Sequence, residues 1–83
     1  MSFRLLIDFE VLDFALKLSK AQQRRLFAHF LAIKSFPGSY SDFMEVDKTG
    51  RSLNVSLFGD YQIRYWIDDA DHHVKILRIT ENE

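Results

Sequence analysis

The spacing of apolar residues changes from a helical period to an extended period near the middle of the chain. Residues 9–33 place apolar side chains three and four positions apart, as on one face of an amphipathic helix. Residues 52–80 mostly alternate apolar and polar side chains, as in strands that have one face in water. The sequence therefore predicts helices in the first half and an antiparallel sheet in the second.

The N-terminal part predicts a strand followed by a first helix. Residues 3–7 favour a short strand, and Leu6 suggests that both faces of this strand are buried. The helix that follows is expected to carry its apolar positions away from Glu10, Asp13 and Lys17. These apolar positions are Phe9, Val11, Leu12, Ala15, Leu16 and Leu18.

A second helix is predicted to begin at Lys20, because Ser19 and Gln22 have the spacing of a capping box. Pro37 and Gly38 are expected to end it, since proline disfavours helix at the preceding residue and glycine permits a turn. Its inward stripe is predicted to consist of Leu26, Phe27, Phe30, Leu31 and Ile33. The two helices would then form an antiparallel hairpin.

The second half predicts strands joined by tight turns. Gly50 lies in a turn position where a positive φ is expected. Gly59 and Asp60 form a two-residue hairpin loop, with glycine in the first position as a type II′ turn requires. Residues 68–72 make the next turn, and residues 74–80 make the last strand.

Strand alternation predicts which side chains face the helices. These are expected to be Leu53, Val55, Leu57, Tyr61, Ile63, Tyr65 and Ile67. The opposite, open face would then carry Ser52, Asn54, Ser56, Gln62, Arg64 and Trp66. The predicted fold class is α+β in the order β-α-α-β-β-β, a two-helix hairpin packed on one face of an antiparallel sheet, in a single domain spanning residues 1–83.

Composition narrows the classes of function. The chain has 83 residues and no cysteine, which excludes disulfides, thiolate metal sites and cysteine nucleophiles. It fits a reducing compartment, so a cytoplasmic location is expected. The apolar runs are too short for a membrane span, and we expect no membrane partner.

Charge is unevenly distributed around a formal net charge of −1. Residues 14–41 contain bases and no acid, whereas both flanking segments are acidic. The overall balance argues against a protein whose affinity comes mainly from neutralising phosphates. The basic second helix offers either a local docking surface or an ordinary solvated face.

The pattern resembles the RelE/ParE toxin superfamily of bacterial toxin–antitoxin systems. The resemblance lies in the N-terminal strand with the helix after it, the Leu-Ser-Lys start of the second helix, and residues 59–68, Gly-Asp-Tyr-Gln-Ile-Arg-Tyr-Trp-Ile-Asp. It implies a toxin-like protein that is neutralised by an antitoxin and acts on the translating ribosome and its mRNA or on DNA gyrase. If the protein is an enzyme, the resemblance implies a ribosome-dependent endoribonuclease.

The departures from the family pattern bear on catalysis. Gln62 stands where the family's nucleases have an arginine, and residues 80–83, Thr-Glu-Asn-Glu, stand where a further basic residue is usual. Those residues neutralise phosphate charge and move protons. The alternative is therefore a non-enzymatic protein-interaction module that kept the scaffold and lost the catalytic residues.

The candidate contacts for nucleic acid or a protein partner are Arg51, Gln62, Arg64, Trp66 and Arg78, with Lys48 beside them. Arg64 and Trp66 share a face and together could stack on a base. In the alternative, Trp66 covers the sheet and Arg64 pairs with an acid. The direction of Arg78 depends on whether a bulge interrupts the last strand.

No metal or cofactor is expected. Acids and histidines gather in one turn, at Asp68, Asp69, Asp71, His72 and His73, a composition that can hold a metal. Asp in hairpin turns commonly bonds the local backbone instead, and we expect that role here.

Overall fold

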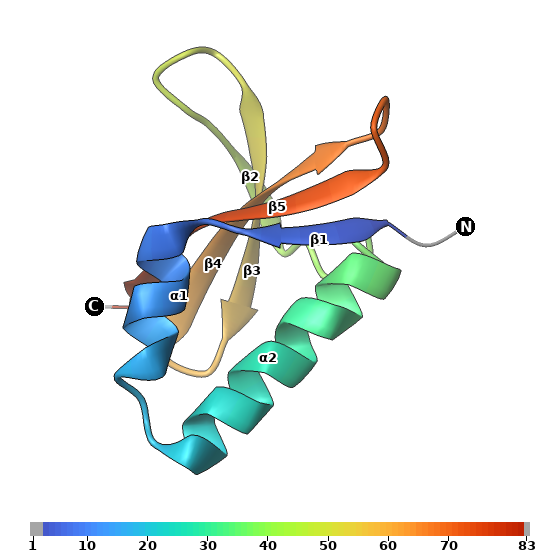
Figure 1. The fold of residues 1–83 in the computed structure, drawn as a ribbon. Coiled ribbons are helices and arrows are strands. Elements are labelled where there is room, and N and C mark those ends of the chain that lie inside the picture. The colour runs from blue at the N-terminus through green and yellow to red at the C-terminus, as the bar shows by residue number, and fades with distance from the viewer. Residues whose placement is uncertain (1–2, 83) are drawn as a thin grey trace.

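The computed structural model describes residues 3–82 and shows two helices on one side of a five-stranded sheet (Figure 1). The elements in chain order are β1 (Arg4–Ile7), α1 (Phe9–Leu16), α2 (Lys20–Ser35), β2 (Phe43–Val46), β3 (Ser52–Phe58), β4 (Tyr61–Asp68) and β5 (His73–Glu81). Neither helix is long and apolar enough to cross a membrane.

The strands are arranged in the order β1-β5-β4-β3-β2. Strands β2 to β5 form an antiparallel meander, and β1 pairs with β5 in parallel, so the sheet is mixed. The α+β class and the helical hairpin agree with the sequence prediction. The strand β2 is an addition to the predicted element order, because Phe43-Met44-Glu45-Val46 does not alternate apolar and polar residues.

Local signals fixed the ends of the helices as predicted. Ser19 Oγ accepts from the Gln22 N–H at 3.2 Å, and Gln22 Oε1 accepts from the Ser19 N–H at 3.1 Å. Both halves of the predicted capping box are therefore present. Gly50 and Gly59 have φ of +85° and +57°, the left-handed values that their turns require.

The core lies between the helices and the inner face of the sheet. The helices contribute Val11, Ala15, Leu26, Phe30 and Ile33, and the strands contribute Ile63, Tyr65, Val74 and Ile76. The Tyr65 hydroxyl donates a hydrogen bond to the carbonyl oxygen of Pro37, which ties β4 to the segment after α2. Burial raises the pKa of Tyr65 to about 12, so the phenol stays neutral.

Part of the predicted apolar face of α1 is wrong. Val11 and Ala15 are buried as expected, but Phe9 and Leu16 are 78% and 63% exposed. The reason is that α1 spans only eight residues and lies at one end of the sheet, so a single narrow stripe of the helix meets the core. Leu31 on α2 and Leu6 on β1 were also expected to be buried, and both are exposed.

The predicted faces of β3 are reversed. Asn54 pairs with Tyr65 and Ser56 pairs with Ile63, so these polar residues share the helix-side face with the core of β4. Val55 pairs with Arg64 instead and lies on the open face, where it is nevertheless buried. Alternation alone assigned the apolar residues to the face that the helices cover. On the open face, however, Val55 lies between its cross-strand neighbours Phe43 and Arg64, and it is buried there.

His29 of α2 explains why a buried serine is tolerated on the helix side. Its Nε2 lies 2.8 Å from Ser56 Oγ, and its ring stacks on Phe58 with 4.5 Å between the ring centroids. Tyr40 packs edge-on against the same imidazole. Burial lowers the pKa of His29, and the negative charge of Asp42 opposes this only in part. The ring is therefore held in its neutral form.

The stability of the domain is expected to fall as the pH is lowered from 7.5 toward 5.5. Because the pKa of His29 is lower in the folded chain than its ordinary 6.5, the unfolded chain binds more protons in that range. The contribution is fully present above pH 6.5 and is lost as the pH falls through the folded value. Urea titrations at several pH values would measure this slope, and a His29→Gln variant should give a flatter profile. An equal slope in the variant would exclude His29 as the cause.

Candidate functional site

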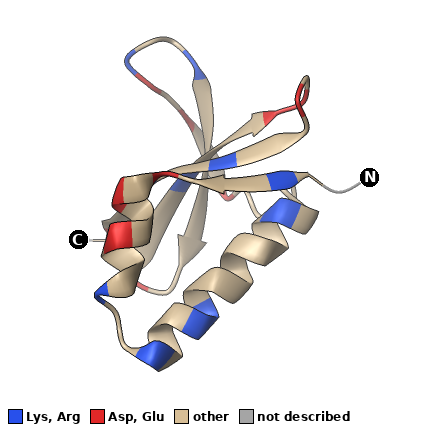
Figure 2. Ribbon diagram, in the orientation of Figure 1, with Lys and Arg blue, Asp and Glu red and all other residues tan. Residues whose placement is uncertain are grey.

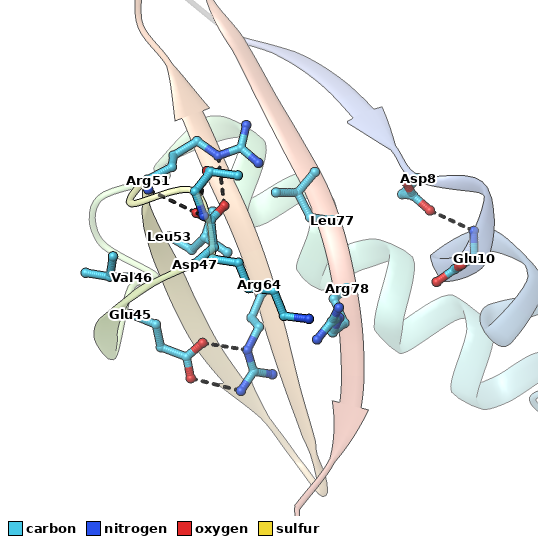
Figure 3. A pocket seen from close by; sticks show the side chains of 12 residues that line it. Asp8, Glu10, Glu45, Val46, Asp47, Arg51, Leu53, Arg64, Leu77 and Arg78 are labelled. Carbon is cyan, nitrogen blue, oxygen red and sulfur yellow. Dashed lines mark hydrogen bonds and ion pairs between the residues drawn. The ribbon is translucent and has the colours of Figure 1, made fainter.

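A cleft of about 570 Å³ opens on the face of the sheet opposite the helices (Figure 3). It is bounded by the β2–β3 hairpin, the middle of β4 and β5, and the start of α1. Its charged lining consists of Asp8, Glu10, Glu45, Asp47, Lys48, Arg51, Arg64 and Arg78. Three of the predicted contact residues, Arg51, Arg64 and Arg78, therefore meet in one place, together with as many acids as bases.

Arg64 lies at the side of this cleft and is held by four hydrogen bonds. Its Nε and Nη2 donate to the two carboxylate oxygens of Glu45 at 2.8 and 2.9 Å, a bidentate pair (Figure 3). Nη1 donates to Thr80 Oγ1 at 2.9 Å, and Nη2 also donates to Gln62 Oε1 at 2.8 Å. The guanidinium is thus oriented by β4 and β5 and neutralised by β2.

The cations around Glu45 keep it charged. The hydrogen bond from Arg64 is the main cause that lowers the pKa of this carboxyl, and the positive charges of Arg64 and Arg78 act in the same direction. The ion pair therefore persists well below neutral pH.

Arg51 belongs to a tightly bonded hairpin turn. Asp47 Oδ1 accepts from the Thr49 N–H, the Thr49 hydroxyl and the Arg51 N–H, and its Oδ2 lies 3.2 Å from Arg51 Nε. These hydrogen bonds, led by that of the Thr49 hydroxyl, lower the pKa of Asp47 to about 2. The carboxylate of Asp47 therefore closes the turn and holds both the backbone and the side chain of Arg51.

Trp66 is covered by cations of the protein itself. The Arg51 guanidinium carbon and the Lys75 ammonium each lie 4.8 Å from the centroid of the indole. Lys75 also lies 3.6 Å from a carboxylate oxygen of Asp68. Trp66 projects from the open face as predicted, but its ring already has partners, as in the structural alternative considered above.

Arg78 is exposed to solvent. The register between β4 and β5 shifts between Arg64 and Tyr65, because Leu77 is an extra residue on β5. This bulge places Arg78 directly opposite Arg64 and exposes it to solvent. Within residues 3–82, neither Arg78 nor Lys48 forms an ion pair.

Sequence reasoning missed the acids of the cleft. Glu45 reaches Arg64 only because β2 joins the sheet beside β3, and β2 had no recognisable strand pattern. Asp8 and Glu10 line the cleft because α1 begins at the end of β1. No local signal predicts these contacts, since they depend on strand order.

Asp68, where β4 ends and the turn to β5 begins, has structural partners. Ligand atoms of Asp68, Asp71 and His73 lie within 4.8 Å of one another. Asp68 Oδ1 accepts from the Asp71 N–H at 3.2 Å, as expected for an aspartate that closes a turn.

Basic residues recur along the length of α2 (Figure 2). Lys20, Arg24 and Arg25 are exposed there. Helix α2 lies on the opposite side of the sheet from the cleft, so its basic residues and the cations of the cleft do not form one continuous surface.

Comparison with solved structures identifies the fold. No protein-family model and no curated protein matches the chain. Among solved structures, the chain is similar to the archaeal RelE–RelB complex from Pyrococcus horikoshii OT3, with a TM-score of 0.81, 24% identity and coverage of 98% of this chain and 96% of that one. It is also similar to a free double arginine-to-alanine mutant of the E. coli toxin RelE, with a TM-score of 0.69, 13% identity and coverage of 98% and 84%. The chain therefore has the fold of the RelE toxins.

Proposed function

We propose that the protein is a toxin-like member of a toxin–antitoxin system and that an antitoxin binds and neutralises it. The observation that carries this proposal is the match of 98% of the chain to a RelE structure solved as a complex with RelB. Small folds host many functions, so the match supports the proposal without defining the target.

Exposed apolar side chains support the existence of a protein partner. Phe9 and Leu16 lie exposed on α1, and Met44 and Val46 lie exposed on β2 at the sheet edge. Large exposed apolar residues and open strand edges are typical of surfaces that another chain covers. An antitoxin that wraps around the domain would bury these positions.

The cleft supports nucleic acid of the translating ribosome as the target, and DNA gyrase is the other target that the resemblance to the RelE/ParE superfamily implies. Arg64, Arg78 and Lys48 can contact phosphates, and Arg78 is exposed beside Arg64. The proposed contact is therefore with a phosphate backbone at the open face of the sheet.

A non-enzymatic interaction module is the second candidate, and the lining of the cleft favours it in one respect. The described residues of that lining include no histidine or tyrosine to move a proton, and Gln62 uses its carbonyl oxygen to hold Arg64. Such a protein would bind the same partners without cleaving RNA.

Induced expression in a bacterium is expected to stop growth, and co-expression of the neighbouring gene should restore it. Arg78→Gln should weaken the arrest, because it removes an exposed cation of the cleft that has no ion-pair partner within residues 3–82. Lys17→Gln is the matched control, since it removes one charge from a solvated position outside the lining of the cleft. Sequencing of ribosome-bound mRNA ends would separate the two candidates: cleavage supports the nuclease, and arrest without cleavage supports the interaction module. Normal growth under strong expression, together with no binding by the neighbouring gene product, would overturn the proposal.

A further inference from the structure

The bidentate pair between Arg64 and Glu45 has the geometry of an occupied anion site. A guanidinium presents two parallel N–H donors to a carboxylate and can present the same pair to a phosphate. Here both donors end on one carboxylate at 2.8 and 2.9 Å. We propose that Arg64, held by Thr80 and Gln62, forms a binding site for a phosphate oxyanion, and that Glu45 fills this site as an internal ligand until an anion displaces it.

The position of the Arg64 guanidinium does not depend on Glu45 alone. Thr80 Oγ1 and Gln62 Oε1 accept from Arg64 at 2.9 and 2.8 Å, and both come from the same two strands, β4 and β5, that hold the guanidinium. Strand β4 is paired on both sides, and the Arg64 side chain is only 17% exposed. After Glu45 leaves, two bonds still aim the guanidinium into the cleft.

Glu45 lies on the part of the sheet that can move most easily. Strand β2 has four residues, lies at the sheet edge and pairs only with β3. Phe43, Met44 and Val46 are exposed, so few apolar contacts hold the strand in place. The Glu45 side chain is 36% exposed, about twice the exposure of Arg64. Displacement therefore moves the carboxylate outward and leaves the arginine where it is.

Charge determines which anion can compete. Arg78 lies opposite Arg64 on β5 and adds its positive charge to the field at Glu45. An anion that reaches both guanidiniums gains more than the single carboxylate of Glu45 can, so groups with several anionic oxygens are favoured. The second guanidinium thus favours phosphate over anions with fewer charged oxygens, while Glu45 lowers the apparent affinity for every competing anion. This proposal rests on the proposed function in one respect: the nucleic-acid contact proposed above would supply the phosphate in the cell.

Titration with inorganic phosphate at constant ionic strength tests the site directly. Backbone amide and arginine Nε signals would be followed by NMR in the full chain. Glu45→Gln is expected to raise the affinity for phosphate by about tenfold, because a site that its internal ligand fills nine-tenths of the time shows about one-tenth of its intrinsic affinity. Glu10→Gln removes an equal charge from the same cleft without touching Arg64, and it should change the affinity by less than about twofold. Adding Arg64→Gln to the Glu45→Gln variant should remove the gain.

Two outcomes would overturn the proposal. One is an equal rise in affinity for Glu45→Gln and Glu10→Gln, which would mean that only net charge matters. The other, measured in the unaltered protein, is saturation by phosphate without shifts at Arg64, Thr80 and the β2 amides. The second measurement does not require a variant to fold. Both use inorganic phosphate in solution, so they stay interpretable if expression proves harmless and the toxin-like role fails.

Discussion

Replacing Phe30 by alanine is expected to remove most of the folding free energy of the domain. Phe30 is fully buried on α2 between the helices and the sheet. Truncation of a buried phenylalanine to alanine costs about 3–5 kcal/mol, because the transfer free energy is lost and a cavity remains. A domain of 83 residues without a disulfide has a total stability of roughly 5 kcal/mol, so only about 0–2 kcal/mol should remain and the variant should unfold at very low urea concentrations.

Urea unfolding followed by circular dichroism and by the fluorescence of Trp66 measures this loss. Phe36→Ala is the matched control, because the same change is made at an exposed position just after α2. It should lower the stability by no more than about 0.5 kcal/mol. Similar losses for the two variants would contradict the packing of α2 described above.

Replacing Ile76 by aspartate is expected to prevent folding, whereas aspartate at the adjacent Leu77 should be tolerated. Ile76 is fully buried opposite Tyr65 and beside Ile7, where a carboxylate would find no partner and little water. A buried, unpaired charge costs several kcal/mol, on the order of 4 or more. Leu77 is the extra residue of the bulge and lines the open cleft, where a carboxylate stays solvated.

This pair of variants also tests which side of β5 faces the helices. Residues 76 and 77 lie on opposite faces in a regular strand too, whereas the bulge determines the direction of Arg78, which a regular strand would turn back toward the helices. The amide spectra of the two variants distinguish a folded chain from an unfolded one. A folded Ile76→Asp protein or an unfolded Leu77→Asp protein would show that the register of β5 is different.

The helices could be predicted well because their signals are local. Ser19 and Gln22 define a helix start within four residues, and Pro37 with Gly38 defines an end. The side of β4 that faces the helices was also predicted correctly, because the large side chains of Ile63 and Tyr65 alternate with the charged Arg64. Such features need no knowledge of distant parts of the chain.

The errors concern features that depend on neighbours in space. The faces of β3 were assigned from apolarity alone, yet His29 of α2 gives buried Ser56 a polar partner. Phe43 of β2 and Arg64 of β4 are the cross-strand neighbours of Val55 on the open face. The pair between Glu45 and Arg64 likewise requires the strand order. A single sequence does not contain that information in a local pattern.

The parallel pairing of β1 with β5 sets when this protein can fold during its synthesis. Strand β1 is made before the other described elements, and its partner in the sheet, β5, is the last of them. Contacts so distant in sequence form late, because a long loop must close before they bring any gain. A nascent chain that has not yet released β5 lacks Val74 and Ile76 of the core. It also lacks Arg78 of the cleft and Thr80, which accepts a hydrogen bond from Arg64. The cleft therefore forms only after β5 has left the ribosome, when the antitoxin proposed above would first have a complete surface to bind.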